Sequence, residues 1–309
     1  MYTRRVSAAA AATPMFTPHH TLLGPDTRAP APPPAAGIPA AAPVPIPLPL
    51  PLPPGTPSIS VVIPARDEAR NLPSVLAELP GGLHEVILVD GASADDTIAA
   101  ARRARPGIRV LSQPGRGTGN ALACGILAAT GEITVTLDAD GSADPAEIAE
   151  FAAALTAGAD FVKGSRYLPG GGSSDLTMLR RAGNGALVLL MNRLYRTEFS
   201  DLCYGYNAFW TRCAAALDLE RIAAADPVFG DGFEIETVLA AHAANARLTV
   251  AEVPSYERDR RYGESHLNTW RDGRRVLRAI LRERRRDPAR TPRTRPARPS
   301  AAPRTVSKP

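Results

Sequence analysis

Short runs of apolar, mostly β-branched residues alternate with helical patterns through the middle of the chain. The first run covers residues 59–63, and Pro64 is expected to end that strand. Further strands are predicted at 86–89, 108–111, 133–137 and 161–163, and helices at 72–79, from 95 onward, at 119–129 and at 176–195. Strands and helices that alternate at this pace are typical of a parallel α/β sheet.

Carboxylates stand where two of these strands end. The run 133–137 stops on Asp138 and Asp140, and the second strand stops on Asp90. Open α/β sheets bind their ligands at this edge. Carboxylates are hard oxygen ligands for Mg²⁺ or Mn²⁺, and such an ion can in turn hold a diphosphate. The sequence therefore indicates a metal site at the end of the fourth strand.

An acidic turn that caps a helix is the alternative interpretation of this stretch. The segment 144–147 has Asp at the cap, Pro at the first helical position and Glu three residues after the cap. A helix start explains Asp144 in this way. It does not explain the two aspartates that precede it.

Three further loops at the same edge carry polar side chains. The segment 64–68 places carboxylates after the first strand, where they suit a ribose or a base, although a charged helix entry has the same composition. The glycine-rich turn 115–120 offers Arg116 to a phosphate, with a plain helix-entry turn as the alternative. Its spacing matches neither a Walker loop nor the dinucleotide fingerprint. The segment 164–167 puts Arg166 where it would meet a phosphate or a sugar.

The two ends of the chain differ from its middle. Thirteen of the 28 residues from 30 to 57 are proline, so neither helix nor sheet can propagate there. We expect a disordered Ala/Pro-rich extension over 1–57, one folded domain over 58–282 and a disordered Arg/Pro-rich tail over 283–309. The prolines also exclude a membrane span in the extension, and the longest apolar run elsewhere, 186–191, is far shorter than the ~20 residues a span needs.

The net charge of +5 lies in the ends of the chain. Residues 282–309 carry +8 and residues 1–57 carry +2, which leaves −5 for the rest and excludes a basic globular face for nucleic acid. The arginine-rich end could meet anionic lipid head groups, although a solvated tail is the commoner explanation of such a run. Cys124, Cys203 and Cys213 have neither a metal-ligand spacing nor an even count, which fits a reducing compartment. With only a weak export-like amino terminus, a cytoplasmic location is predicted.

Five segments in the right order resemble family 2 glycosyltransferases of the GT-A fold, and among them most closely the dolichyl- or polyprenyl-phosphate sugar transferases. The segments are 62–68, 89–93, 138–140, 164–167 and 261–265, within a resemblance that covers roughly residues 58–278. Five ordered motifs are more specific than any single one. The resemblance implies an α/β/α sandwich with a mostly parallel central sheet, a GDP- or UDP-linked sugar donor, Mg²⁺ or Mn²⁺, and inversion at the anomeric carbon.

The resemblance also implies roles for individual residues. Those matched to the nucleotide-sugar donor are Pro64, Ala65, Glu68, Asp90, Asp138, Arg261 and Ser265. Those matched to the metal ion are Asp138, Asp140 and Ser142. Those matched to catalysis are Asp140, Arg166 and Glu236.

The chain departs from the family pattern at three places. Arg66 and Asp67 replace the usual Tyr-Asn pair, and Gly91 replaces a second acid after the second strand. His266 stands where a lysine is common in the loop that closes over the diphosphate. The last departure bears most on how the diphosphate is neutralised.

The stretch from 176 to 210 bears on the acceptor. The predicted helix 176–195 combines Arg180 with an apolar run, so it could rest at a bilayer near a polyprenyl chain, or it could be an ordinary buried helix. The segment 200–210 is rich in aromatic residues, and we expect Asp201 and Tyr206 on the acceptor side together with Arg180.

The main hypothesis is an inverting, metal-dependent glycosyltransferase that acts on polyprenyl phosphate at the cytoplasmic face of the membrane, with peripheral contact to it. A lipid phosphate is already anionic and needs no strong base, whereas a soluble hydroxyl acceptor would need Asp231 or Glu236 as a general base. Transfer to such a soluble acceptor is one alternative. A non-catalytic nucleotide-sugar-binding scaffold on the same fold is the other.

Overall fold

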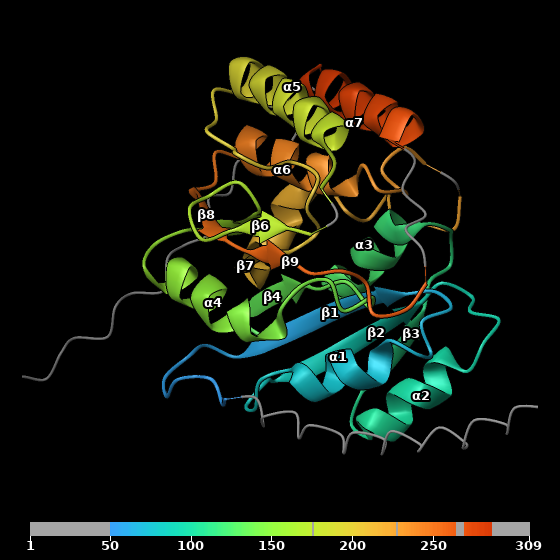
Figure 1. Cartoon of the computed structure of the whole chain (residues 1–309). Helices are drawn as coiled ribbons and strands as arrows, with labels where there is room; N and C mark the ends of the chain where they lie inside the picture. Colours follow the sequence, from blue (N-terminus) through green and yellow to red (C-terminus); the bar gives the residue numbers. More distant parts are fainter. Residues whose placement is uncertain (1–49, 175, 227, 264–268, 286–309) are drawn as a thin grey trace, which may run out of the picture. The chain divides into compact units, whose positions relative to one another are not determined.

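The computed structural model describes residues 50–285 except for 175, 227 and 264–268. These residues form a central seven-stranded sheet with helices around it (Figure 1). In sheet order the strands are β3 (Arg109–Ser112), β2 (Glu85–Asp90), β1 (Ile59–Ala65), β4 (Ile133–Thr136), β7 (Asn207–Trp210), β5 (Phe161–Ser165) and β8 (Val250–Pro254). β7 is antiparallel to both neighbours, and the other neighbouring pairs are parallel. The short strands β6 (Gly172–Ser173) and β9 (Tyr256–Glu257) form a second, two-stranded sheet. The mostly parallel central sheet predicted from the sequence is confirmed.

Helices cover both faces of this sheet (Figure 1). They are α1 (Leu72–Glu78), α2 (Thr97–Ala104), α3 (Thr118–Ala128), α4 (Ile148–Thr156), α5 (Met178–Tyr195), α6 (Ile235–Asn245) and α7 (Thr269–Arg284), with the 3₁₀ turns η1 (Pro145–Glu147) and η2 (Thr211–Leu217). Side chains alternate across a strand, so Val61 of β1 packs in the core with α1 and α4, whereas Val62 packs in the core with α3 and α6. A third apolar cluster, which includes Met191 and Ile280, joins α5 and α7 to α6.

Each strand and helix predicted above is present, with ends shifted by a few residues. Pro64 does not end the first strand, because β1 continues to Ala65 and Pro64 pairs in register with Val89 of β2. The missing N–H of proline is tolerated there because the opposite neighbour, β4, pairs with β1 only as far as Val62. The antiparallel strand β7 was not predicted.

The capped helix start is present at η1. Asp144 accepts a hydrogen bond from the Ala146 N–H at 3.0 Å, and Pro145 occupies the first position. Glu147 does not bond back to the cap, because its carboxylate accepts hydrogen bonds from Ser255 and from the Tyr256 N–H instead. η1 therefore fastens the start of α4 to the segment after β8.

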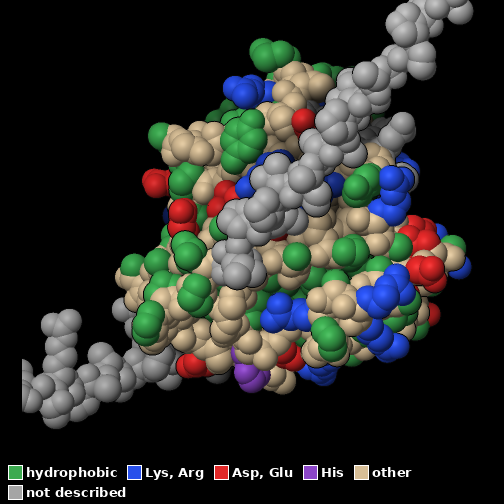
Figure 2. Space-filling view, turned by 60° about the horizontal axis from the view of Figure 1, so that its bottom comes forward, with side chains coloured by type: hydrophobic (Ala, Val, Ile, Leu, Met, Phe, Trp, Pro, Cys, Tyr) green, Lys and Arg blue, Asp and Glu red, His purple; other side chains and the backbone are tan. Residues whose placement is uncertain are grey.

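Ordered contacts extend past both ends of the folded domain that the sequence predicts, 58–282. Leu52 donates a backbone hydrogen bond to Gly81, and α7 continues past residue 282, with Glu283 buried and bonded to His242 of α6. Within the described residues, no helix combines the length and apolarity that crossing a bilayer requires. On the face in Figure 2, Lys and Arg side chains form several separate groups with acidic and apolar side chains between them.

Candidate active site

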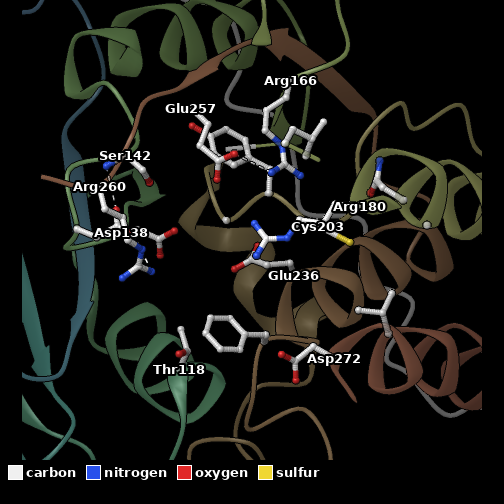
Figure 3. A pocket seen from close by; sticks show the side chains of 18 of the residues that line it. Thr118, Asp138, Ser142, Arg166, Arg180, Cys203, Glu236, Glu257, Arg260 and Asp272 are labelled. Atoms are coloured by element: carbon white, nitrogen blue, oxygen red, sulfur yellow. Dashed lines mark hydrogen bonds and ion pairs between the residues drawn. The ribbon is translucent and has the colours of Figure 1, made fainter. Parts of the chain in front are cut away.

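A cavity of about 380 Å³ lies at the carboxyl ends of the parallel strands, between the segment after β4 and the helices α5 and α7. Figure 3 shows carboxylates of Asp138 and Glu236 and guanidinium groups of Arg166 and Arg260 around the same hollow. Arg180 of α5 lines it from the other side. The sheet topology explains this clustering, because the loops that follow parallel strands meet at one edge.

Asp140 is held in place by two contacts. Its Oδ1 accepts the backbone N–H of Ser142 at 2.9 Å, in a turn where Gly141 takes a positive φ of 78°. Its Oδ2 lies 2.9 Å from Nη2 of Arg260. Asp140 and Ser142 both line the cavity, and both side chains are largely buried.

Few groups stabilise the negative charge of the Asp138 carboxylate. Among the described residues, none donates a hydrogen bond to this carboxylate. Burial raises its pKa, and the nearby charges of Asp140 and Glu236 raise it further. A Cβ at Gly205 would lie 3.1 Å from Asp138 Oδ2, so the glycine leaves room at this carboxylate. The result is a half-buried acid that lines the cavity in a position that suits a bound cation.

Glu236 enters the cavity from the first turn of α6. Its Oε2 accepts a hydrogen bond of 2.5 Å from Nδ2 of Asn207, in the strand β7. Burial raises the pKa of Glu236, whereas Lys163 and Asn207 oppose that rise. Glu236 lines the cavity.

Arg166 reaches the cavity wall but is already held by two acids. Its Nε and Nη2 donate to the carboxylate of Asp201 at 2.7 and 3.0 Å, and its Nη1 donates to Glu257 at 2.9 Å. Asp201 is fully buried and does not line the cavity. The residue expected on the acceptor side therefore orients an arginine in this structure.

Asp90 is the last residue of β2, next to the loop that follows β1, and it does not line the cavity. Its Oδ2 accepts the Ser93 N–H at 3.2 Å, but its buried Oδ1 has no hydrogen-bond partner among the described residues. Nearby, Asp67 accepts a hydrogen bond from the Ala94 N–H at 2.6 Å and its own N–H donates to Ser93 at 3.0 Å. The loops after β1 and β2 are thus joined around a buried, unsatisfied acceptor.

The loop after β9 places Arg260, rather than Arg261, at the cavity. Arg261 forms an ion pair with Glu78 of α1, and it does not line the cavity. Arg258 is paired with Asp144. Ser265 lies outside the described residues. The arginine that contacts Asp140 is therefore Arg260, one residue before Arg261, which the family resemblance matched to the diphosphate.

The model for glycosyl transferase family 2 matches residues 60–218, just over half of the chain. The chain belongs to this family. An undecaprenyl-phosphate mannosyltransferase of Micrococcus luteus is 30% identical over 219 residues, 68% of this chain and 87% of the relative. A polyprenol monophosphomannose synthase of Mycolicibacterium smegmatis is 29% identical over 218 residues, 67% of this chain and 80% of the relative.

An uncharacterized glycosyltransferase of Mycobacterium tuberculosis is 42% identical over 109 residues, 35% of this chain, and the match spans 49% of that relative. Among solved structures, glucosyl-3-phosphoglycerate synthase of Mycobacterium tuberculosis in complex with Mn²⁺, UDP and glucosyl-3-phosphoglycerate has a TM-score of 0.57 at 23% identity. The match covers 74% of this chain and 80% of that one. Together with the sheet order, this likeness establishes the GT-A fold for the family 2 chain.

The glycine-rich turn of this family 2 chain packs against protein backbone. A Cβ at Gly117 would lie 2.2 Å from the carbonyl oxygen of Asp231, and a Cβ at Gly119 would lie 2.0 Å from that of Gly230. The N–H groups at the start of α3 are also used, since Gly119 donates to the Asp231 carbonyl at 2.8 Å. Arg116 is exposed and does not line the cavity. The geometry favours the helix-entry interpretation of the turn.

Two more residues matched to the site lie away from the cavity. Asp231 pairs with Arg275 of α7 at 2.8 Å and is not part of the lining. Tyr206 is buried in the core, where it stacks on Phe151 with ring centroids 4.3 Å apart and donates a hydrogen bond to the Asp144 carbonyl. Both side chains already have protein partners that hold them in these positions.

The first-loop residues lie beside the cavity rather than in its lining. Pro64 and Ala65 are buried at the end of β1. Glu68 is half-buried; burial raises its pKa, Asn71 opposes that rise, and the charge of Asp140 adds to it. Glu68 is therefore electrostatically coupled to the aspartates, although it is in a different loop.

Arg260, Asn207 and Lys163 are among the groups at or under the cavity that the sequence did not indicate as site residues. Three of the four residues at 258–261 are arginine, which indicates a basic loop, but no periodicity shows which arginine turns toward the cavity. Lys163 also had a signal, because a lysine inside an apolar strand that is buried on both faces must find internal partners.

Proposed function

We propose that the chain is an inverting, metal-dependent glycosyltransferase that moves a sugar from a nucleotide-sugar donor to a polyprenyl-type lipid phosphate. The observation that carries the proposal is the pair of carboxylates, Asp138 and Asp140, that faces a cavity at the end of β4. Family membership supports the reaction class, and the pair supports the place where the leaving group would be held.

The donor atoms fit Mg²⁺ or Mn²⁺ shared with a diphosphate. Within the described ranges, no three His, Cys, Asp or Glu side chains are grouped so as to hold a metal ion. Hard divalent cations in substrate sites are commonly held by one or two carboxylates, with phosphate oxygens and water completing the shell. Asp138 and Asp140 meet that need, with Ser142 beside them. A cation would offset both the burial and the repulsion that raise the pKa of Asp138.

Charge at the leaving group is the main requirement of the reaction. A bound metal ion supplies positive charge to the departing nucleoside diphosphate. Arg260, next to Asp140, can add hydrogen bonds to the same oxygens. One displacement at the anomeric carbon inverts its configuration. A lipid phosphate attacks as an anion, whereas a hydroxyl acceptor would use Glu236 as its base.

The nucleotide is proposed to lie over the first loop, with its base at Asp90. The buried Oδ1 of Asp90 lacks a partner among the described residues, and an N–H of uracil or guanine would supply one. The solved glucosyl-3-phosphoglycerate synthase was crystallised with UDP and Mn²⁺. The base of a UDP-linked or a GDP-linked donor could donate this hydrogen bond to Asp90 equally well.

The acceptor end of the cavity combines cations with apolar side chains. Arg180 lines it from α5, and Leu187 and Val276 line it from α5 and α7. This composition suits a phosphate attached to an isoprenoid chain. The names of the Micrococcus luteus and Mycolicibacterium smegmatis relatives point to polyprenyl acceptors. A soluble acceptor is the alternative, favoured by the solved neighbour, which was crystallised with glucosyl-3-phosphoglycerate.

We also propose peripheral contact of α5 and α7 with the cytoplasmic face of a membrane. Large apolar side chains on these helices are exposed, namely Met178, Leu179, Leu189, Trp270, Leu277 and Leu281. The sequence continues from α7 into residues 286–309, which are rich in arginine. Apolar side chains next to basic ones favour insertion at an anionic lipid surface.

Transfer from a radiolabelled donor tests the proposed reaction. The full chain, polyprenyl phosphate in detergent, Mn²⁺ and either UDP- or GDP-linked sugar should yield labelled, solvent-extractable glycolipid. Asp140→Asn should lower kcat by about 100-fold or more. Glu150→Gln, an exposed acid on α4, is the matched control and should leave transfer intact. Donor binding without turnover in the wild type would favour the scaffold, and label on a water-soluble acceptor alone would favour the soluble alternative.

Sedimentation with vesicles tests the membrane contact separately. The wild type should bind vesicles that contain phosphatidylglycerol, and Leu189→Glu combined with Trp270→Glu should remove most of that binding. Leu127→Glu is the control, because this side chain on α3 is also exposed but lies on another helix. Equal binding by all three proteins would contradict the contact.

A further inference from the structure

A fully buried lysine lies beneath the cavity and takes no part in the chemistry described above. Lys163 is in the middle of β5, between β7 and β8, and has no exposed surface. Its Nζ donates hydrogen bonds to the Tyr204 carbonyl at 2.5 Å and to Oδ1 of Asn207 at 3.2 Å. A buried ammonium group is costly unless opposite charge or hydrogen bonds compensate it.

The amide of Asn207 connects this lysine to the cavity. Its Oδ1 faces Lys163, and its Nδ2 donates to Oε2 of Glu236 at 2.5 Å. The reversed amide would set its NH₂ group against the ammonium and its oxygen against the carboxylate, so the two charges fix one orientation. The chain of contacts thus runs from a buried cation to an acid that lines the cavity.

The backbone around Asn207 is held as well. Its N–H donates to Oγ1 of Thr136 at 3.2 Å, and that hydroxyl donates to the Gly205 carbonyl at 3.0 Å. Thr136 is the last residue of β4, two residues before Asp138. β5 with the lysine, β7 with the amide and β4, which the aspartates follow, are therefore joined side by side at this point.

We propose that Lys163 is a positioning residue, which through Asn207 fixes the carboxylate of Glu236 in one orientation at the cavity and offsets its charge. This inference rests on the proposed function and gives Glu236 a part in transfer to either acceptor. Its carboxylate lies beside that of Asp138, since Asp138 Oδ2 and Glu236 Oε1 are 3.1 and 3.5 Å from the same Cβ position at Gly205, so its orientation affects the pair that is proposed to hold the metal ion. The competing explanation is a purely structural lysine that only anchors the Tyr204 carbonyl. The two explanations differ in whether the effect of Lys163 depends on Glu236.

A double-mutant cycle on thermal stability measures that dependence without any substrate. Lys163→Met should lower the Tm of the full chain by roughly 5–10 °C, because it leaves Glu236 buried without its cation. In the Glu236→Gln background the same change should lower the Tm by less than half as much. Val162→Ala, on the same strand, should lower the Tm equally in both backgrounds. Equal losses for Lys163→Met in both backgrounds would overturn the coupling.

The same variants in the transfer assay show whether the coupling serves the reaction. Lys163→Met should lower kcat by about 10- to 100-fold with the donor KM within about twofold, and should have little further effect in Glu236→Gln. Asn207→Leu keeps the lysine and should show the same pattern, so the test stands even if Lys163→Met does not fold. An unchanged kcat, or an equal fall in both backgrounds, would overturn the positioning role.

Failure of the proposed function gives a different result. A folded wild type that transfers no sugar from any donor contradicts the proposed reaction and, with it, the positioning role. In that case the stability cycle still decides whether Lys163 and Glu236 are energetically coupled. Transfer by the wild type together with additive effects would contradict the positioning role alone.

Discussion

Arg260 and Asp140 form an ion pair of 2.9 Å between the loop after β9 and the turn after β4. The arginine thus occupies one oxygen of a carboxylate that is also proposed to hold a metal ion. A metal ion and diphosphate bound at Asp140, as proposed, would share or replace this contact, and the loop after β9 would then respond to what binds at the aspartates.

Replacement of Arg260 should affect transfer much more than replacement of Arg261. Arg260→Ala should lower kcat/KM for the donor by about 100-fold, since it removes a cation beside the developing diphosphate charge. Arg261→Ala should lower it less than about fivefold, because Arg261 pairs with Glu78 near the surface. Steady-state kinetics at saturating Mn²⁺ measure both. A larger loss for Arg261→Ala than for Arg260→Ala would instead support Arg261 as the diphosphate contact.

Asp201 should matter for stability rather than for acceptor binding. Asp201→Asn leaves the buried guanidinium of Arg166 without its bidentate partner and should lower the free energy of unfolding by about 3 kcal/mol. Urea denaturation measures the change. A higher acceptor KM with an unchanged unfolding curve would instead identify Asp201 as an acceptor contact.

Gly119 should tolerate no side chain. Its added Cβ would meet the Gly230 carbonyl oxygen at 2.0 Å, so Gly119→Ala should lower the free energy of unfolding by about 2 kcal/mol or more. Gly185→Ala on α5 is the matched control, because nothing lies within 4 Å of its Cβ position. That change should raise stability by about 0.5–1 kcal/mol. A harmless Gly119→Ala would contradict the close packing of the turn.

Glu85 should stabilise the fold in a pH-dependent way. Burial would raise its pKa, but hydrogen bonds from Thr130, Ser60 and Arg109 hold it at about 2 instead of 4.5. A lowered folded-state pKa gives stability that is present above the unfolded value and lost as the pH falls toward 2. Glu85→Gln should therefore cost about 2–3 kcal/mol at pH 7.

The cost of Glu85→Gln should shrink steadily as the pH falls from about 4.5 toward 2. Guanidinium denaturation of both proteins across this range measures the difference. A difference that stays constant with pH would show that the hydrogen bonds, and not the ionisation of Glu85, provide the stability.

The sequence predicts the parts of the site that follow regular strands. Asp138 and Asp140 follow β4 as the run 133–137 indicated, and a period-2 pattern is enough to place such residues at the sheet edge. The alternation of strands and helices likewise predicts the parallel portion of the sheet. In both cases local pattern and tertiary position agree.

The remaining residues depend on partners far along the chain. Asp231 is held by Arg275 of α7, and the segment that carries Asp231 also occupies the turn around Gly119. Tyr206 is drawn into the core by Phe151. Asp231 and Tyr206 themselves lie in irregular segments, in which no spacing rule indicates the direction of a side chain.

The position of β7 has a consequence for how the protein is made. β1 to β4 pair with one another, so that part can form as soon as residues up to 136 have left the ribosome. β5 has only β7 and β8 as neighbours, and both come later in the chain. The pairing of β5 must therefore wait until β7 and then β8, which ends at Pro254, have been synthesised, and nascent chains released before residue 207 would expose β5 as an unpaired strand.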